Sequence, residues 1–351
     1  MTPGPDGYHV ARYEPRLRAA VCRLQQLHWA PDPEVNSLYF EWKYERNPYL
    51  SHPHVYLAMH EGDVIGMRGV YGARWEVGVR ARTFEIPCAA DLVIAPEHRG
   101  RGVFTRIMQC ALADLRHEDV AWLFNLSASA ATRLGSLGMK WRAAGPIERM
   151  TRPAAARGPA RQVFAWWRAA RHRSGVRARI ELSDTVRPEA MAELLERTGR
   201  TGRIRHVRDD EYFAWRFQNP LSSYRFVFLG GRRLDAYLVL RSARYVPHGR
   251  STWIADWAGV SPAARLRVLA AALEMSGPFE VWSGPLDEAD RNELRRAGFL
   301  DRPARSFAEY YPCVLVRPVA PEPPPPPWQL EGLDLLDVAS WDVRLLDSDG
   351  T

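Results

Sequence analysis

The sequence predicts a mixed α/β protein of the α+β kind, made of two tandem domains in which helices flank twisted mixed sheets. Three observations support this prediction. The chain has 351 residues, which is longer than one hydrophobic core usually grows. Patterns typical of strands and of helices alternate along it. One series of residues also occurs twice in the same order, which indicates a tandem duplication.

The repeat is clearest in an aromatic segment. Residues 39–48 read YFEWKYERNP, and residues 212–220 read YFAWRFQNP. After each copy comes an extended apolar stretch, a turn and a second such stretch, which predicts a hairpin. Farther on, Asp91 and Asp256 each follow an alanine and precede a proline that opens a helical pattern. Near the end of each copy, Leu137-Gly-Met139 corresponds to Ala297-Gly-Phe299. These four landmarks in the same order indicate that the second half copies the first.

The elements expected in the first copy follow from hydrophobic periodicity. We expect a strand at 8–13, a helix at 14–28, strands at 55–59, 64–71 and 86–94, a helix at 103–117, a strand at 121–126 and a short helix before Gly138. The resulting domain prediction is an N-terminal domain at 1–151, a basic linker at 152–178, a C-terminal domain at 179–318, and a polyproline spacer with an acidic tail at 319–351. Tryptophans such as Trp42 and Trp215 are expected in the core, with an acceptor site as the alternative.

Composition and charge bound the function classes. With 46% hydrophobic and 25% charged residues, the chain is globular, and no run approaches the roughly 18 apolar residues of a membrane span. No signal peptide is evident, so we expect a cytoplasmic protein without a membrane partner. The four cysteines form no CxxC pair, which predicts buried thiols rather than a cysteine zinc site.

Charge is unevenly distributed. Residues 149–179 contain nine arginines and no acidic residue, while residues 318–351 contain seven acidic residues and one arginine. A nucleic-acid partner would therefore have to bind the segment 149–179. For the tail two hypotheses stay open: it folds back on the basic linker, or it is disordered and solvated.

The segment 91–108, DLVIAPEHRGRGVFTRIM, carries the strongest functional signal. A strand enters a turn rich in glycine and arginine, and that turn opens directly into an amphipathic helix. Backbone N–H groups at such a helix start, with Gly100 and Gly102 leaving room for close approach, can hold a phosphate. Arg99 and Arg101 add positive charge. The alternative is a tight turn with solvated arginines.

These residues resemble the GNAT superfamily of acyl-CoA-dependent N-acyltransferases. Its signature, Arg/Gln-x-x-Gly-x-Gly/Ala, is matched by the segment 99–104 except at Phe104, and Leu137-Gly138-Met139 is similar to the end of a later family helix. The resemblance implies acetyl-CoA or another acyl-CoA as co-substrate, and no metal. The residues implied to bind it are Leu92, Val93, Ile94, Arg99, Gly100, Arg101, Gly102, Val103, Phe104 and Thr105.

The resemblance also implies direct attack of an amine on the thioester, whose oxygen is polarised by a backbone N–H near 92–94. Glu85 and Asp91 are the candidate catalytic bases, since they are six positions apart and a regular strand would place them on one face. As an alternative, each is a strand-end charge or a partner of an arginine. The family often uses a tyrosine as acid, but its position holds Leu134, and the preceding asparagine position holds Ser127.

The second copy lacks the glycine turn, because Ser261-Pro262-Ala263 stands in its place. We therefore expect one acyl-CoA per chain. The predicted function is transfer of an acyl group, by preference acetyl, to an amine of a small molecule or biosynthetic intermediate. The alternatives are FemABX-like aminoacyl transfer from tRNA and a non-catalytic CoA-binding scaffold. The pair His52 and His54 lacks a third ligand nearby in the sequence, so no metal site is expected there.

Overall fold

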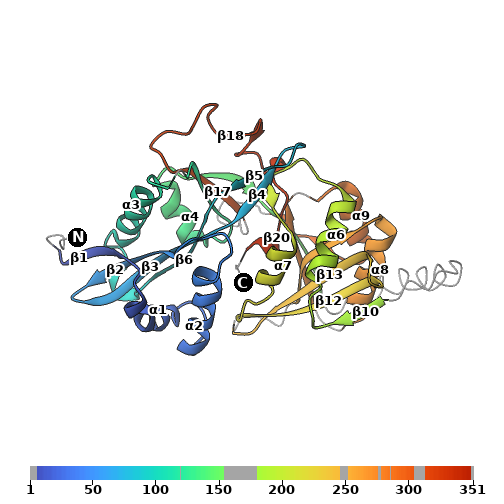
Figure 1. Ribbon diagram of the computed structural model, residues 1–351, viewed down its shortest axis with the longest axis horizontal. Helices are drawn as coiled ribbons and strands as arrows, with labels where there is room; N and C mark the ends of the chain where they lie inside the picture. The colour runs from blue at the N-terminus through green and yellow to red at the C-terminus, as the bar shows by residue number, and fades with distance from the viewer. Residues whose placement is uncertain are drawn as a thin grey trace, which may run out of the picture.

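The computed structural model describes residues 6–118, 120–153, 180–245, 252–275, 278–284, 286–303 and 313–348. In this part of the chain two lobes lie side by side, each built around its own mixed sheet (Figure 1). This arrangement confirms the predicted fold class. Among the described residues, no helix combines the length and apolar character needed to cross a lipid bilayer.

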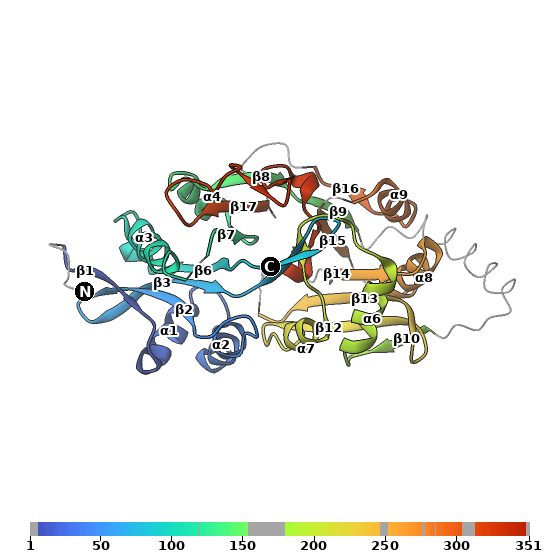
Figure 2. The same cartoon turned by 45° about the horizontal axis from the view of Figure 1, so that its top comes forward.

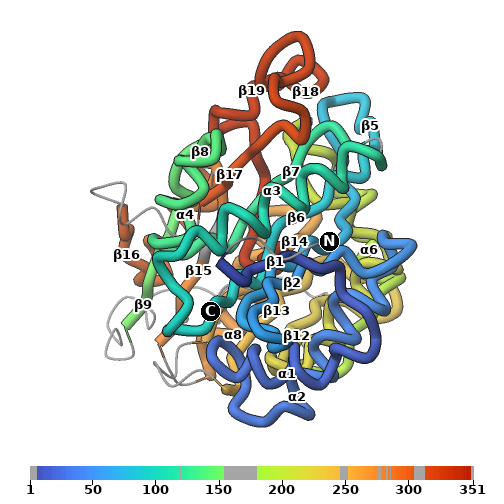
Figure 3. The backbone as a smooth tube through the Cα atoms, turned by 90° about the vertical axis from the view of Figure 1, so that its left-hand side faces the viewer, coloured from blue at the N-terminus to red at the C-terminus, as the bar shows by residue number. Residues whose placement is uncertain are grey.

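The first lobe has a seven-stranded sheet in the order β1-β2-β3-β6-β7-β17-β8. Its strands are β1 (Tyr8–Arg12), β2 (His54–His60), β3 (Asp63–Tyr71), β6 (Cys88–Ile94), β7 (Trp122–Asn125), β17 (Cys313–Pro318) and β8 (Arg142–Pro146). One face packs on α1 (Arg18–Gln25), α2 (Pro33–Phe40) and a π-helical turn at Glu41–Glu45, and the other on α3 (Val103–Leu115) and α4 (Ala130–Leu137). Figure 3 shows α1 and α2 below β1 and β2, and α3 above these two strands.

The second lobe repeats this plan. Its sheet has the order β10-β12-β13-β14-β15-β9-β16, with β10 (Ile180–Ser183), β12 (Ser222–Gly230), β13 (Leu234–Ala243), β14 (Thr252–Gly259), β15 (Phe279–Gly284), β9 (Glu148–Arg152) and β16 (Leu300–Asp301). The helices are α6 (Pro188–Thr198) and α7 (Asp210–Arg216) on one face, and α8 (Pro262–Leu273) and α9 (Glu288–Arg296) on the other. Figure 2 shows the two sheets edge-on. The matching order of elements supports the duplication.

The two lobes exchange one strand each, which corrects the predicted intervals 1–151 and 179–318. β17 comes from the C-terminal half of the chain but pairs with β7 and β8 of the first lobe. In return β9, from the end of the first interval, pairs with β15 and β16 of the second lobe. Each sheet therefore contains an interior strand that the other interval supplies. Neither interval forms a complete sheet alone.

A small sheet and the tail join the lobes. β4 (Arg74–Val77) pairs with β5 (Arg82–Glu85) and with β11 (Arg205–His206). The tail forms β18 (Gln329–Leu330), β19 (Leu333–Asp334), short helical turns at Val338–Ser340 and Leu345–Asp347, and β20 (Val343–Arg344).

The hypothesis of a disordered, solvated tail is therefore wrong. Leu335 and Trp341 are buried in the first lobe's core, and Leu345 and Leu346 in that of the second. Apolar residues spaced between the acidic ones direct this packing, a signal that the charge count concealed. The alternative hypothesis, docking on the basic linker, concerns residues outside the described ranges.

The repeated tryptophans meet at the junction between the lobes. The rings of Trp42 and Trp215 stack with centroids 5.0 Å apart and planes within 13°. Each indole N–H donates to the other residue's backbone carbonyl, at 2.8 Å from Trp42 and 2.9 Å from Trp215. Both side chains are buried, so the structure confirms the core interpretation and places it between the two copies.

We expect Trp42→Phe to lower the free energy of unfolding by about 0.5–1.5 kcal/mol, because the carbonyl of Trp215 loses the Trp42 indole donor and keeps only the N–H of Gln218. Urea unfolding followed by circular dichroism measures this change. The slope of the unfolding free energy against urea concentration should stay the same in both proteins. Trp328→Phe is the control, since the Trp328 ring is only half-buried. Equal stability losses in the two variants would contradict a role for the reciprocal hydrogen bonds.

Candidate functional site

A cleft opens where two neighbouring strands of the first lobe separate. β6 and β7 run parallel and pair only at Cys88 and Phe124, at the start of β6. Beyond that point a cavity of about 670 Å³ lies between them. Its lining comes from β6, from the start of α4 and from the loop after α1: Asp91, Leu92, Val93, Ile94, Ser127, Ser129, Ala130, Ala131, Thr132, Leu27, His28 and Trp29, with Arg68, Arg99 and Phe104.

The backbone of β6 is distorted within this cleft. On β3, Met67 pairs with Val93 and Gly69 pairs with Ala90, so two residues of β6 stand opposite Arg68 alone. This is a β-bulge, which interrupts the ladder and redirects backbone groups. Asp91, the first of the two residues opposite Arg68, has a φ of 50°. Strained backbone of this kind is concentrated at functional sites.

The glycine turn at the end of β6 has the shape expected of a phosphate cradle. Gly100 and Gly102 have φ values of 74° and 72°, and a Cβ added to either would meet no atom within 4 Å. No side chain caps the start of α3, so its first N–H groups are available to an anion. Arg99 is more than a solvated charge, because its Nε donates to the carbonyl of Ile94 at 3.0 Å and so holds the turn against β6.

Of the residues predicted to bind the co-substrate, Leu92, Val93, Ile94, Arg99 and Phe104 line the cleft. Gly100, Arg101 and Gly102 form the turn beside it, and Thr105 lies in the first turn of α3. The side chain of Val103 is buried in the core under α3, so only its backbone can contribute. The binding roles of these residues stay predictions, but the structure places all of them at the cleft, at the turn beside it or in the first turn of α3.

Asp91 lies at the cleft but is held by three donors. Its Oδ1 accepts from Lys43 at 3.0 Å and from Tyr39 at 3.2 Å, and its Oδ2 accepts from Tyr44 at 2.7 Å. The side chains of Lys43 and Asp91 are 0% and 1% exposed. The structure thus gives Asp91 a buried ion pair, but its partner is a lysine and not an arginine as the alternative had it. The sequence did not predict a role for Lys43, although it is one of only two lysines in the chain.

Glu85 does not share a strand face with Asp91, which corrects the geometry assumed for the two candidate bases. Glu85 ends β5 and pairs across to Arg74, whereas β6 begins at Cys88, after Pro87. Proline cannot donate to a ladder, so the continuous strand predicted at 86–94 starts late. Glu85 lies in a different cavity, of about 1020 Å³. The two candidate bases therefore lie at different cavities, Asp91 at the first and Glu85 at the second.

His54 of the histidine pair lines that second cavity, as does Glu118. Glu118, distant in sequence, brings its carboxylate to 3.1 Å from His54 Nε2 and 3.5 Å from His52 Nε2. The expectation that no third group stands near the pair is thus wrong in three dimensions. Burial lowers the pKa of His54, although Glu118 opposes this change. Glu118 contacts both imidazoles, so the three groups satisfy one another as they stand.

The start of α4 provides hydroxyl groups but no tyrosine. Ser129 caps the helix by accepting from the N–H of Thr132 at 3.3 Å, and Ser127 lies beside it in the cleft lining. Leu134, which occupies the family's usual tyrosine position, is 64% exposed. Leu134 has no acidic group and does not line the cleft, so it does not replace the tyrosine as the acid.

In the second lobe the corresponding opening is filled by the tail. β15 pairs with β14 only over 279–281 and uses its other edge for β9. β20 pairs with Ser283 and Gly284, so it must lie on the edge that β14 has left. The start of α8 is capped by Ser261, which accepts from the N–H of Ala264 at 3.2 Å. Within the described residues, the helix start here is thus capped, and a cavity of only about 20 Å³ lies between β14 and α8.

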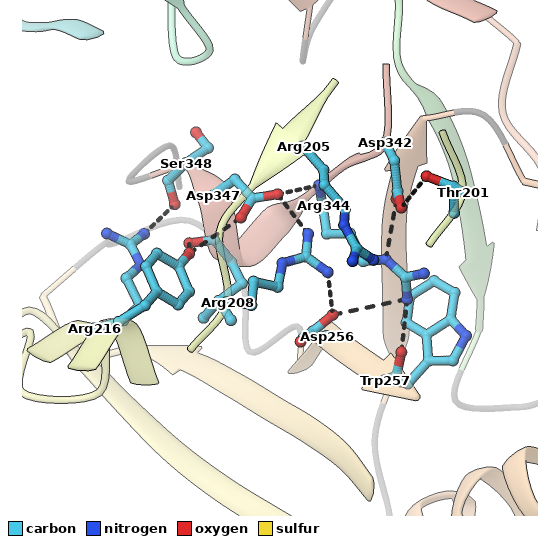
Figure 4. Close-up of polar contacts among 12 residues, drawn as sticks. Thr201, Arg205, Arg208, Arg216, Asp256, Trp257, Asp342, Arg344, Asp347 and Ser348 are labelled. Atoms are coloured by element: carbon cyan, nitrogen blue, oxygen red, sulfur yellow. Dashed lines mark hydrogen bonds and ion pairs between the residues drawn. The ribbon is translucent and has the colours of Figure 1, made fainter. Parts of the chain in front are cut away.

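Figure 4 shows how polar contacts fix the tail there. Asp256, the counterpart of Asp91, contacts Arg208 at 3.2 Å and Arg344 of the tail at 3.7 Å. Arg208 also donates to Asp347 at 2.8 Å. The chain's own residues thus occupy the place that is open in the first lobe.

Comparison with known proteins agrees with this geometry. Residues 18–141 match the family described as acetyltransferase (GNAT) domain. The first lobe is a GNAT acetyltransferase domain. Members of this family transfer acyl groups and generally use acetyl-CoA as co-substrate. No match was found among curated proteins.

Solved structures extend the similarity from this GNAT domain to both lobes. A probable N-acyltransferase of unknown function from Enterococcus faecalis has a TM-score of 0.61 at 14% identity, over 89% of this chain and 72% of that one. A GCN5-related N-acetyltransferase from Anabaena variabilis has 0.58 at 15%, over 89% and 73%. A tandem GNAT protein from the clavulanic acid biosynthesis pathway has 0.55 at 11%, over 90% and 99%. At these identities the likeness concerns the fold, and it supports the tandem arrangement.

Proposed function

We propose that the first lobe transfers an acyl group, by preference acetyl, from acyl-CoA to an amine of a small molecule or biosynthetic intermediate. The observation that carries this proposal is the open cleft between β6 and β7, which ends at the uncapped start of α3. The turn at Gly100 and Gly102 fits a pyrophosphate, because the space beside both glycines is free. The acyl thioester would then extend along β6 toward the bulge.

In this arrangement the protein contributes mainly position and polarity. Acyl-CoA supplies the activated acyl group, and holding the amine beside it replaces a bimolecular encounter. The backbone N–H groups of the segment 92–94, which lie beyond the last pair with β7, would polarise the carbonyl oxygen. A direct attack then needs only a group that accepts the amine's proton.

Two groups at the cleft can take part in that proton transfer. Asp91 is one, although Lys43 and two tyrosines already surround it. His28 is the other: desolvation lowers its pKa from 6.5, with Lys43 adding to this effect and Asp91 opposing it. A histidine with a lowered pKa is neutral at pH 7 and can accept a proton. Glu85 lies in the other cavity and has no such position.

Isothermal calorimetry with CoA tests the proposal, and we expect one site per chain. The first lobe has the free turn, whereas β20 fills the second opening. Acetyl-CoA consumption with a panel of amines then measures turnover. Binding of two CoA molecules would contradict the filled second cleft. Binding without turnover would favour a scaffold, and retention of charged tRNA without CoA binding would favour aminoacyl transfer.

A further inference from the structure

A buried arginine in the cleft has two guanidinium nitrogens that meet no partner in the part of the chain that the structure describes. Arg68, on β3, is 2% exposed and lines the cavity beside the bulge. Two of its guanidinium nitrogens, Nε and Nη2, make no hydrogen bond within the described residues. An ion taken out of water without a partner destabilises a fold by several kcal/mol. Arginine at such a position is retained for a reason other than stability.

The charge balance around Arg68 leaves it uncompensated. Asp91 is the nearest carboxylate that affects it, but the oxygens of Asp91 already accept from Tyr39, Lys43 and Tyr44. One negative charge thus faces two positive charges, those of Lys43 and Arg68. Burial lowers the pKa of Arg68 to about 10, and Tyr44 and Asp91 oppose this effect. The guanidinium therefore stays charged at neutral pH, and the inner cleft carries one excess positive charge.

The position of Arg68 separates it from the phosphate cradle. It stands opposite Asp91 and Leu92 at the bulge of β6, whereas the glycine turn begins after β6 has ended at Ile94. An anion at Arg68 therefore belongs to the reacting end of the substrates rather than to the pyrophosphate. A guanidinium presents its N–H groups as a planar fork, which fits a carboxylate in a bidentate manner.

We propose that Arg68 binds a carboxylate carried by a reacting substrate, which makes amines of the amino-acid type the acceptor class. This proposal rests on the proposed acyl transfer. The same chemistry has a second source, a dicarboxylic acyl group such as succinyl on the donor. In either case the carboxylate supplies the charge that the cleft lacks, and the specificity of the enzyme follows from leaving Arg68 unpaired when that group is missing.

The test compares carboxylates with matched amides. With acetyl-CoA as donor, kcat/KM is measured for L-amino acids and for their C-terminal amides, and succinyl-CoA is compared with acetyl-CoA in parallel. Calorimetry of the CoA-saturated protein with N-acetyl-L-alanine and N-acetyl-L-alaninamide gives a readout independent of turnover. The wild type should favour the carboxylate at least tenfold in one of these comparisons. Which comparison responds identifies acceptor or donor as the source.

Arg68→Met should abolish that preference while the Kd for CoA stays within about threefold. Its Tm should not fall, because an unpaired buried charge is removed. Arg68→Lys keeps the charge without the fork and should retain part of the preference. Arg317→Met is the matched control: Arg317 is 8% exposed, its Nε and Nη1 lack partners among the described residues, and it lies outside the lining of this cleft.

Two results would overturn the inference while leaving the proposed function in place. One is a wild-type protein that binds CoA but treats carboxylate and amide alike in all three comparisons. The other is an Arg68→Met variant that keeps the preference, or an Arg317→Met variant that loses it to the same degree. Absence of CoA binding by the wild type would instead remove the proposed function, and the inference with it.

Discussion

Replacing Gly102 with valine should lower the affinity for CoA at least a hundredfold. Gly102 has a φ of 72°, in the left-handed region where a β-branched residue is strained by about 1–3 kcal/mol. No protein atom lies within 4 Å of an added Cβ, so the fold itself has room for the side chain. The new methyl groups would project into the space that a phosphate needs at the start of α3. Calorimetry with CoA measures the effect.

Gly199→Val provides a stringent control for backbone strain. Gly199 follows α6 in the second lobe with a φ of 84°, and it too has free space where a Cβ would be placed. Its ψ of 177° lies in a region nearly confined to glycine, so Gly199→Val should lose at least as much stability in thermal unfolding, but only Gly102→Val should lose CoA. If Gly102→Val bound CoA as the wild type does, the phosphates would not lie at this turn. If both variants lost CoA, strain rather than contact would be the cause.

The local part of the candidate site was predictable because its signals are local. Gly100 and Gly102 set a turn between an apolar strand and an amphipathic helix, and the structure has that order, with α3 beginning at the predicted Val103. The hairpin of β2 and β3 likewise follows from two apolar stretches around a short turn. In such segments the residues that determine the backbone lie within a few positions of one another.

What the sequence did not reveal depends on contacts between distant residues. β17 reads CVLVRP and is buried along its length, a pattern that fits an interior position in either sheet. Nothing in it says that its neighbours are β7 and β8 of the first lobe. The pairing of Asp91 with Lys43 could not be read from the sequence, because the two residues are 48 positions apart. Asp91 therefore remained a candidate base. Nothing in the sequence around Arg68 indicates that this arginine is buried.

Deleting residues 328–351 should prevent the protein from folding to its native stability. The ring of Trp341 is fully buried and meets Phe124 edge-on at 4.9 Å and Trp75 at 5.8 Å. Losing such a ring costs about 3–5 kcal/mol by itself, and Leu345 and Leu346 leave a second core at the same time. Calorimetric unfolding and proteolysis measure the loss. A truncated protein with a Tm within a few degrees of the wild type would show that the tail is peripheral.

A single carboxylate separates the tail's ion pairs from its apolar packing. Burial alone would raise the pKa of Asp347, but Arg208, His206 and the N–H of Arg344 outweigh it and lower the pKa below 3.8. A lowered pKa means that Asp347 stabilises the fold above about pH 4 and ceases to do so as the pH falls below its folded-state pKa. Asp347→Asn should therefore unfold more easily than the wild type at pH 7, by about 1–3 kcal/mol, because Arg208 loses one of its two buried carboxylate partners and keeps Asp256. The difference should shrink below about pH 4, where the carboxylate is protonated in the unfolded wild-type chain, and should be lost below the lower folded-state pKa. A difference that stayed constant from pH 7 to pH 3 would assign the tail's contribution to packing alone, because only the ion pair depends on the proton.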